Sequence, residues 1–404
     1  MKILVVTQYF WPENFKINDL CIGLKERGNQ VTILTGKPNY PFGKYFEGYS
    51  FFSKNIDSFE EIKVYRTWLY PRKNGKGLNL VLNYLSFVIF GSFRALLMRG
   101  DYDRILVYEP SPITVGIPAI VAKWKSGAKM YFWVQDLWPD SITAAGGIKN
   151  KYILNFVDSI TRFIYHCSDK LLLQSRSFIP YVLNQRVPHE KLIYYPNSTE
   201  SYYNVVPIKE EIRSKFPQGF NLLFAGNIGE AQSFDTLIES AIKLYEKSLQ
   251  VNWIILGDGR MKKQFEEKVE NLGIGSRFLF LGSFPSNHMP DYFRCADALL
   301  ISLKKDKIFS MTIPSKLQSY MACGRPIIGS LDGEGASIIE EAQAGIVAPA
   351  EDVEALTKAI ESLIDLPAES RDKMGANARK YFEQEFEREI LIDKLEAIFQ
   401  DQSN

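Results

Sequence analysis

The sequence has few of the residues that metal sites, disulfide frameworks and histidine-based catalysis require. Its 404 residues include only three histidines and four cysteines. The cysteines lie far apart with no Cys-x-x-Cys spacing, which argues against a disulfide framework or a zinc site and favours reduced thiols. No histidine has a partner at metal-ligand spacing, so a histidine metal site or a Ser-His-Asp triad is not expected.

The sequence also lacks a dinucleotide fingerprint and a large net charge. The loop "FWPENFKINDL" after the first strand contains no G-x-G-x-x-G, which argues against NAD binding. The formal net charge is +1, yet residues 1–200 hold 25 basic and 16 acidic side chains, whereas the remainder holds 23 and 31. This asymmetry favours an anionic partner for the first half, such as phosphate groups or an acidic membrane surface, with chance as the alternative. We expect no nucleic-acid partner.

Continuous apolar segments alternate with helical ones along the whole chain. The chain is longer than a domain with a single hydrophobic core usually is, and the pattern restarts after residue 218. We therefore predict an α/β fold of two Rossmann-like domains, each with a doubly wound parallel sheet, facing each other across a cleft. The domains are expected at 1–198 and 219–382, joined by a linker at 199–218 and followed by a helix at 383–404. The expected strands are 2–10, 30–36, 104–110, 128–136, 169–175, 190–197, 220–227, 251–259, 276–283, 298–303, 325–330 and 344–350.

One segment, "LNLVLNYLSFVIFGSFRALLMRG" at 78–100, interrupts this alternation. Its length would admit a membrane span, although Arg94 and the surrounding pattern argue against crossing. The cations Arg72, Lys73 and Lys76 precede it, as they would precede a helix lying at a membrane surface. Contact with a membrane surface, burial in the protein and a true span all remain open.

The stretch "SKLQSYMACGRPIIG" predicts a short helix over 315–323. Ser315 would be its N-cap, Gln318 stands at capping-box spacing, and Gly324 would end it. The first turn would hold Lys316, where the helix dipole and a formal charge both favour a diphosphate. Ser319 would face the ligand. Thr312 and Ile313, just before the helix, would offer backbone N–H donors.

Two loops after strands of the first half carry polar candidates. Asn14 and Lys16 stand at a helix start, where backbone N–H groups favour an anion; a plain helix start capped by Asn14 is the alternative. Gln135 and Asp136 end the strand "AKMYFWVQD", and Asp136 could accept a hydroxyl proton or bind a sugar hydroxyl.

The second half repeats this arrangement with glycines. Gly226 and Gly229 in "FAGNIGEAQ" would permit close backbone approach to a ligand. Asn227 and Gln232 in the same loop can bind phosphate oxygens but carry no charge. Gly257 in "LGDGR" repeats the arrangement, with an ordinary Asp-Gly turn as the alternative.

These motifs resemble a known family. "IPSKLQSYMACGRPIIGS" and "GEGASIIEEAQAGIVAPAEDVEALTKAI" resemble the C-terminal signature of the retaining, GT-B-fold glycosyltransferases of family 4. "VTQYFWPEN", "LTGKPNYPFGKY" and "FWVQDLWPDS" resemble its bacterial O-antigen and capsule subgroup, with N-acetyl-L-fucosamine transferases the most similar. The resemblance covers essentially the whole chain. It implies a GT-B architecture, and we expect the helix at 383–404 to return to the first domain.

The resemblance implies transfer of a sugar from a UDP-sugar, without metal or cofactor, to a lipid-linked saccharide. The donor would bind the second domain and the acceptor the first. Asp136, Gln135 and Lys316 would be the catalytic residues, and the helix start would stabilise the departing UDP in place of a metal. Such an enzyme would be cytoplasmic and peripherally associated with the inner face of the cell membrane.

Several positions depart from the family pattern. Gln135 stands where the family has a histidine, Asn227 and Gln232 where it has Arg and Lys, and Met311 and Ser319 where it has paired glutamates. Either another carboxylate holds the ribose, with Glu340 as the candidate, or the ribose is held less tightly. Besides Lys316, the missing charge could come from Arg260 or from Arg325, which could instead cap a helix.

The departures leave two alternatives open beside a transferase. One is a UDP-sugar 2-epimerase of the same fold, although three scattered histidines suit it poorly. The other is a non-catalytic nucleotide-sugar-binding assembly subunit, which the missing charges would favour.

Overall fold

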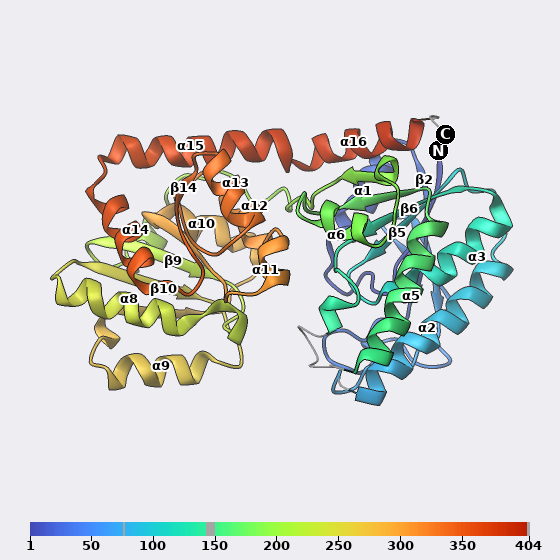
Figure 1. The fold of residues 1–404 in the computed structure, drawn as a ribbon, viewed down its shortest axis with the longest axis horizontal. Helices are drawn as coiled ribbons and strands as arrows, with labels where there is room; N and C mark the ends of the chain where they lie inside the picture. Colours follow the sequence, from blue (N-terminus) through green and yellow to red (C-terminus); the bar gives the residue numbers. More distant parts are fainter. Residues whose placement is uncertain (76, 143–149, 402–404) are drawn as a thin grey trace. The chain divides into compact units, whose positions relative to one another are not determined.

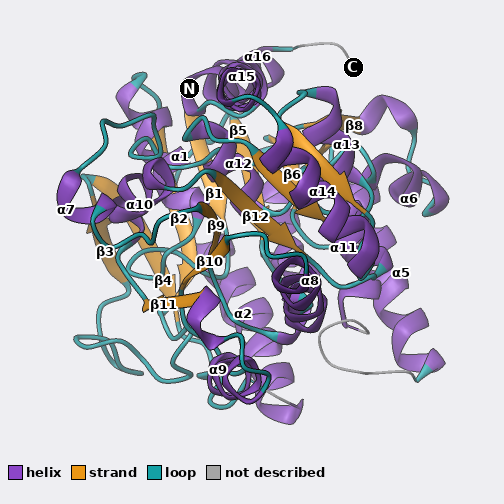
Figure 2. Cartoon of the chain, turned by 90° about the vertical axis from the view of Figure 1, so that its left-hand side faces the viewer, coloured by secondary structure: helices purple, strands orange, loops and turns teal. Residues whose placement is uncertain are grey.

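The structure is a computed structural model that describes residues 1–75, 77–142 and 150–401. It divides into two compact units, Met1–Pro196 with Leu391–Asn404, and Asn197–Ile390. Each unit is a sheet flanked by helices (Figures 1 and 2), which confirms the predicted α/β class with two Rossmann-like domains. The segment 199–218, expected to be a linker, belongs to the second unit. The chain re-enters the first unit at Leu391 rather than at residue 383.

The first unit contains an eight-stranded sheet of order β3-β4-β2-β1-β5-β6-β7-β8. Every neighbouring pair is parallel except β3–β4. The β3–β4 hairpin was not predicted, because its strands "IDSF" and "IKVYRT" lack a continuous apolar run. The order of connection reverses between β1 and β5, and ligands of such sheets bind at this switch point. The strands are β1 Lys2–Val6, β2 Gln30–Gly36, β3 Ile56–Phe59, β4 Ile62–Thr67, β5 Arg104–Glu109, β6 Lys129–Val134, β7 Lys170–Leu173 and β8 Leu192–Tyr194.

Helices cover this sheet, and one of them, α16, comes from the C-terminal part of the chain. Figure 1 shows α2, α3 and α5 beside one another. Helices α1 and α16 pack on the sheet face that carries Ile3 and Val5. Helix α16 is held there by the Arg104 side chain, which donates to the Phe399 carbonyl at 2.7 Å, so the predicted return of the C-terminal helix is correct. The helices are α1 Lys16–Glu26, α2 Gly77–Leu97, α3 Gly116–Ser126, α5 Lys151–Cys167, α6 Phe178–Asn184 and α16 Arg388–Gln400, with 3-10 turns η1 Ile113–Val115 and η2 His189–Lys191.

Helix α2 is the apolar segment singled out in the sequence. Among the helices that the structure describes, it alone has the length and composition to cross a membrane. One side packs against α3 and the sheet. The other side exposes its apolar residues, with Leu78 71%, Ile89 63% and Phe93 61% accessible. The interpretation of α2 as a fully buried helix is therefore wrong.

The second unit contains a six-stranded, entirely parallel sheet of order β11-β10-β9-β12-β13-β14. Here the connection reverses between β9 and β12. The strands are β9 Phe220–Ala225, β10 Val251–Leu256, β11 Phe278–Gly282, β12 Ala298–Ser302, β13 Ile327–Ser330 and β14 Gly345–Ala348. The helices are α7 Glu210–Arg213, α8 Phe234–Glu246, α9 Lys262–Asn271, α10 Met289–Cys295, α11 Lys307–Met311, α12 Ser315–Ala322, α13 Glu334–Glu341, α14 Val353–Asp365 and α15 Ala368–Glu385, with 3-10 turns η3 Glu230–Gln232, η4 Gly275–Arg277 and η5 Ser286–His288.

Helix α12 starts and ends almost where the sequence predicts, but its start is built differently. Pro314 is the N-cap and Ser315 the first helical residue, with no side-chain cap hydrogen bond. The Gln318 side chain is buried and donates to the Asn197 carbonyl at 2.6 Å, so the predicted Ser315–Gln318 capping box is wrong. Gly324 follows the helix with φ 63°, the left-handed conformation that ends many helices, as predicted.

Candidate functional site

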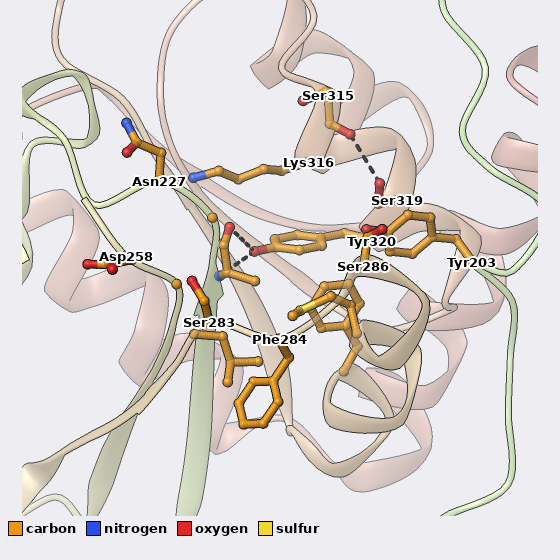
Figure 3. A pocket seen from close by; sticks show the side chains of 16 residues that line it. Tyr203, Asn227, Asp258, Ser283, Phe284, Ser286, Ser315, Lys316, Ser319 and Tyr320 are labelled. Atoms are coloured by element: carbon orange, nitrogen blue, oxygen red, sulfur yellow. Dashed lines mark hydrogen bonds between the residues drawn. The ribbon is translucent and has the colours of Figure 1, made fainter. Parts of the chain in front are cut away.

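A cavity of about 330 Å³ lies at the carboxyl ends of β9, β10 and β11. Helix α12 contributes one wall (Figure 3). This position, at the switch point between β9 and β12, is where doubly wound sheets bind ligands, and the volume suits a small-molecule site. The lining residues are Tyr203, Ala225, Gly226, Asn227, Leu256, Gly257, Asp258, Ser283, Phe284, Ser286, Met289, Phe293, Ser315, Lys316, Ser319 and Tyr320.

Two glycines at the strand ends give the cavity its depth. Gly226 has φ 135° and Gly257 has φ 140°, conformations that residues with a Cβ rarely adopt. A Cβ at Gly226 would lie 2.8 Å from Lys316 Cε, and one at Gly257 would lie 1.9 Å from the Gly226 carbonyl oxygen. Any side chain at either position would therefore collide with the wall or displace Lys316.

Lys316 is the cation of the cavity. It lies in the first turn of α12, and Figure 3 shows its side chain extending toward Asn227. Its Nζ donates to Oε1 of Gln232 and lies 3.8 Å from the centroid of the Phe224 ring. Burial lowers the pKa of Lys316 to about 7. An anion bound beside Nζ would restore the charge, because a nearby opposite charge favours the protonated form.

Aromatic side chains make up another part of the wall. The Tyr320 hydroxyl accepts from the Ala225 N–H at 2.9 Å, which ties α12 to the end of β9. Phe293 lies edge-on to Tyr320 with ring centroids 5.0 Å apart, and Tyr203 stacks on Phe293 at 6.2 Å. The cavity thus combines a cation at a helix start with flat apolar surfaces.

Ser319 lines the cavity one turn after Ser315. Its Oγ donates to the Ser315 carbonyl at 3.4 Å and lies 3.0 Å from Oγ1 of Thr199. Thr199 donates to Oε2 of Glu200 at 3.1 Å. A carboxylate therefore lies two hydrogen bonds from the position where a glutamate was expected.

Several residues predicted for this site do not line the cavity. Glu340 is exposed near the end of α13 and outside the lining set, and a contact between Glu340 and the ribose stays a prediction. Gly229 is also outside the lining set, and Gln232 touches the site only through Lys316. The Thr312 N–H donates to the Phe309 carbonyl at 3.3 Å and is therefore already occupied.

The remaining predicted residues, Ile313, Arg325 and Arg260, also lie outside the cavity. Ile313 is buried in the core and does not line the cavity. Arg325 donates to the Ala296 carbonyl, at the C-cap of α10, so it caps a helix other than α12. Arg260 is exposed outside the lining set. Among the predicted donor residues, the cavity brings together Asn227, Gly257, Ser315, Lys316 and Ser319.

Sequence reasoning missed part of the wall. Tyr203 lies in the segment that was expected to be a linker, and Asp258 was treated only as a turn residue. The loop after β11 and helix α10 supply further residues that carried no periodic or motif signal. These are Ser283, Phe284, Ser286, Met289 and Phe293.

In the first unit, Asp136 and Gln135 follow β6 directly, beside the end of β5 at Glu109. Glu109 is fully buried, and its Oε2 accepts from the backbone N–H groups of Gln135 and Asp136, each at 3.3 Å. Burial and the Asp136 charge raise the pKa of Glu109 well above its usual value, and burial raises the pKa of Asp136 to about 7. The pair therefore retains a proton at neutral pH. Sequence reasoning missed Glu109, although a charged residue ending an apolar strand was a readable signal.

Other polar groups gather near this pair. Arg72 donates to the Tyr9 hydroxyl at 3.4 Å, and its guanidinium lies 4.9 Å from the centroid of the Tyr40 ring. Tyr84 of α2 has a raised pKa, chiefly through burial, and is close enough to feel Arg72, Asp136 and Glu109. The switch point of the first unit thus presents carboxyls, hydroxyls and a cation.

The loop after β1 is organised by Glu13. Its carboxylate accepts from the N–H groups of Asn39 and Tyr40 at 2.7 Å each and of Phe10 at 3.1 Å. Burial raises the pKa of Glu13 to about 7 despite these bonds. Asn14 is exposed, and Phe15 is the N-cap of α1 without a side-chain cap bond, so Asn14 is not the cap. Lys16 is the first residue of α1. Ligand binding by Asn14 and Lys16 stays a prediction.

Within residues 1–75, 77–142 and 150–401, no three His, Cys, Asp or Glu side chains are grouped so that they could hold a metal ion. Independence from metal stays a prediction.

Comparison with known proteins relates most of the second unit to a known family. The family model described as "Glycosyl transferases group 1" matches residues 208–381. We refer to residues 208–381 as the group 1 domain, after the family that they resemble. Every cavity-lining residue except Tyr203 lies within it. The cavity is therefore built mainly by residues 208–381, and the preceding segment adds Tyr203.

Relatives extend the likeness beyond the group 1 domain. WcaI of Escherichia coli K12, named for colanic acid biosynthesis as a glycosyl transferase, is 26% identical over 97% of this chain and 98% of its own. Anabaena HepE, solved in complex with UDP, superposes with a TM-score of 0.70 at 14% identity over 98% of this chain and 99% of its own. The lipopolysaccharide glycosyltransferase WaaG superposes with a TM-score of 0.67 at 16% identity over 99% of this chain and all of its own. These structures support the GT-B fold; the N-acetyl-L-fucosamine subgroup stays a prediction.

Proposed function

We propose that the protein is a retaining glycosyltransferase that moves a sugar from a UDP-sugar to a lipid-linked saccharide in O-antigen or capsule biosynthesis. The sugar is an N-acetylamino sugar such as N-acetyl-L-fucosamine. The observation that carries the proposal is the placement of Lys316: one cation in the first turn of α12, inside a cavity at the switch point of a group 1 domain. The resemblance to WcaI over nearly the full length supports a role in surface polysaccharide synthesis.

The donor occupies the cavity of the second unit. Its diphosphate lies against Lys316 and the start of α12, where the helix dipole adds to the side-chain charge, and Asn227 binds a phosphate oxygen. The nucleoside lies against Tyr203, Phe293 and Ser319. The HepE structures with UDP and with UDP-glucose support a nucleotide-sugar donor.

Transfer breaks the bond between the anomeric carbon and the diphosphate oxygen, and the bonding electrons leave with UDP. Lys316 and the N–H groups of the helix start stabilise this negative charge without a metal. The acceptor oxygen then forms the new bond on the face that UDP leaves. Asp136 accepts the hydroxyl proton, for which a pKa near neutrality is suitable. Gln135 binds a sugar hydroxyl beside it.

The enzyme works at the cytoplasmic face of the cell membrane as a peripheral protein. The exposed apolar side of α2, with Leu78, Ile89 and Phe93, supports this, because contiguous exposed apolar surface commonly marks an interaction site. Arg72 and Lys73 precede α2, as expected for an interfacial helix. Lys76 lies outside the described residues.

The deciding experiment measures UDP release and sugar transfer by the purified protein. A thermal-shift screen against a panel of UDP-sugars first identifies the donor, since a bound ligand stabilises the fold. A transferase then releases UDP stoichiometrically with transferred sugar only when a lipid-linked acceptor is present. An epimerase would convert donor alone, and a binding subunit would release nothing; either result would refute the proposal.

A further inference from the structure

A second cavity, of about 220 Å³, lies in the first unit at the amino ends of β1, β2 and β4. This is the edge of the sheet opposite the one that carries Asp136. It therefore belongs neither to the proposed acceptor site nor to the donor cavity, and no proposed step of sugar transfer uses it.

Cations dominate the lining of this cavity. The lining includes Lys2, Lys63 and Arg99 and the carboxyl group of Asp101. Asp103, which accepts from the Lys2 backbone N–H at 2.7 Å, places a second carboxylate next to the cavity. Within the part of the chain that the structure describes, none of the three cationic side chains forms an ion pair or a hydrogen bond. Lys63 contacts only the face of the Tyr65 ring, 4.8 Å from its centroid. Three unpaired cations around a hollow repel one another, and a bound anion would relieve that repulsion.

Hydroxyl groups complete the lining. Thr32, Tyr65 and Tyr102 contribute them from β2, β4 and the segment before β5. Burial raises the pKa of Tyr102 to about 12, so its hydroxyl stays a neutral donor at physiological pH. Gly100 leaves room for the Tyr102 ring, because a Cβ at this position would lie 3.0 Å from Cζ of Tyr102 and the ring would have to shift. Cationic and hydroxyl donors in one concave site are the groups that bind phosphate oxygens.

The cavity adjoins the end of the apolar side of α2. Arg99 follows Leu97, the last residue of α2, by two positions, and both Leu96 and Leu97 are exposed. Lys125 of α3 donates to the carbonyls of Leu96 and Met98, which holds this end of α2 beside α3. A protein lying on a membrane through α2 would bring the cavity to the depth of the lipid phosphates.

We propose that this cavity binds a phosphate-bearing anion through Lys2, Lys63 and Arg99. The phosphate is that of an anionic lipid headgroup or of a free phosphate compound, and the two sources share the same chemistry. The proposal does not depend on sugar transfer: a protein without transferase activity would still carry the site.

The test compares the full chain with a K63Q/R99Q variant. A K215Q/K373Q variant is the matched control, because it loses the same charge from exposed positions in the second unit. Binding is measured by co-sedimentation with phosphatidylcholine vesicles, with and without phosphatidylglycerol. We expect K63Q/R99Q to lose roughly 30-fold in partitioning to the anionic vesicles, since each basic residue near such a surface contributes substantially. The control should lose far less.

A second arm uses soluble probes without lipid. Inorganic phosphate and glycerol 3-phosphate are titrated into each protein, and tyrosine or backbone amide NMR signals near Tyr102 are followed. A saturable shift in the wild type that K63Q/R99Q lacks, without discrimination between the vesicles, assigns the site to a free phosphate. Discrimination between vesicles assigns it to a lipid. Equal behaviour of K63Q/R99Q and the wild type in both arms would overturn the proposal, and UDP binding by each variant reports whether it is folded.

Discussion

The hydroxyl oxygens of Ser319 and Thr199 lie 3.0 Å apart in the wall of the donor cavity. Thr199 gives its only proton to Glu200, and the single Ser319 proton is shared between the Thr199 oxygen at 3.0 Å and the Ser315 carbonyl at 3.4 Å, so the Ser319 lone pairs remain able to accept from a ligand hydroxyl. The chain from Ser319 to Glu200 thus transmits the influence of a carboxylate to the place where a family glutamate would stand. Glu340, the candidate suggested by sequence, is exposed elsewhere on α13.

This relationship predicts which carboxylate supports the nucleotide. We expect Glu200→Gln to weaken UDP binding by roughly fivefold, the effect of about one ordinary hydrogen bond, because Glu200 acts through two hydroxyl groups, whereas Glu340→Gln should leave UDP binding unchanged. Isothermal titration calorimetry of both variants makes the comparison. The reverse ranking of Glu200 and Glu340 would show that the hydroxyl chain has no part in binding.

Lys316 is predicted to supply most of the charge at the diphosphate. Lys316→Met should lower kcat/KM by about 10²–10³-fold, because it removes a preorganised donor at developing negative charge. The melting temperature should not fall, since the replaced side chain is a cation whose charged form burial disfavours. Lys305→Met is the control: it removes a nearby exposed charge and should change kcat/KM little. Near-wild-type activity of Lys316→Met would exclude Lys316 from the diphosphate site.

Donor binding is predicted to take up a proton. The Lys316 pKa is about 7 in the free protein, so at pH 8 most molecules carry a neutral amine. A bound diphosphate favours the charged form and raises this pKa, so binding draws a proton from solution and affinity rises as pH falls from 9 toward 7. Calorimetry in two buffers of different ionisation enthalpy measures the uptake. Lys316→Met should abolish it, and an unchanged uptake in that variant would assign the proton to another group.

Asp136 is predicted to act in transfer and not in donor binding. Asp136→Asn should lower kcat/KM by roughly 10²-fold, the usual contribution of a general base, while UDP affinity stays as in the wild type. Because the pKa of Asp136 is raised to about 7, wild-type kcat/KM should rise as pH increases through that value. The kcat/KM of the variant should not show this rise. A pH profile of kcat/KM for both proteins is the measurement. Loss of UDP affinity would contradict the assignment of Asp136 to the acceptor side.

Glu109→Gln is predicted to stabilise the fold increasingly as pH rises. Glu109 holds its proton in the folded protein, whereas in the unfolded chain it loses it near the ordinary carboxyl pKa. Above that value the folded state binds more protons than the unfolded one, so the wild type loses stability with rising pH, by up to about 1.4 kcal/mol per unit from this group. Glutamine cannot ionise, but its oxygen can accept from the same two N–H groups. Urea unfolding should show that the free energy of unfolding of the variant, relative to that of the wild type, is higher at pH 8 than at pH 5.

A stability difference between Glu109→Gln and the wild type that does not change between pH 5 and pH 8 would mean that Glu109 is ionised in the folded protein. Glu109 and Asp136 titrate together, so the difference between the two proteins reports the proton that the pair shares in the wild type.

Local pattern was sufficient for much of the fold. Continuous apolar runs such as 129–134 and 251–256 are buried on both faces of parallel sheets, and no other arrangement satisfies their backbone so well. Gly324 ends α12 because glycine, which has no Cβ, adopts φ 63° without steric strain. The β3–β4 hairpin was not predicted because neither of its strands has a continuous apolar run, although only β3 lies at the edge of the sheet.

The donor cavity was only partly predictable. Lys316 and Asn227 stand beside strand ends and helix starts, which the order of elements reveals. Tyr203 could not be found, because its approach to the cavity depends on how the segment after Pro196 packs against the group 1 domain. Gln318 shows the same limit: its spacing from Ser315 indicated a cap, yet burial turns it to Asn197.

The sequence by itself determined the two α/β units, the loops that carry polar residues, and the helix that places Lys316 at its start, because periodicity and turn chemistry are local properties. Only the tertiary structure decided which of those groups meet. Glu109 and Asp136 are 27 positions apart, and parallel pairing of β5 with β6 brings them together and raises both pKa values. Lys2, Lys63 and Arg99 likewise share a cavity only because three strands begin at one edge. Charge and burial at such sites arise from neighbours in space, which no local pattern encodes.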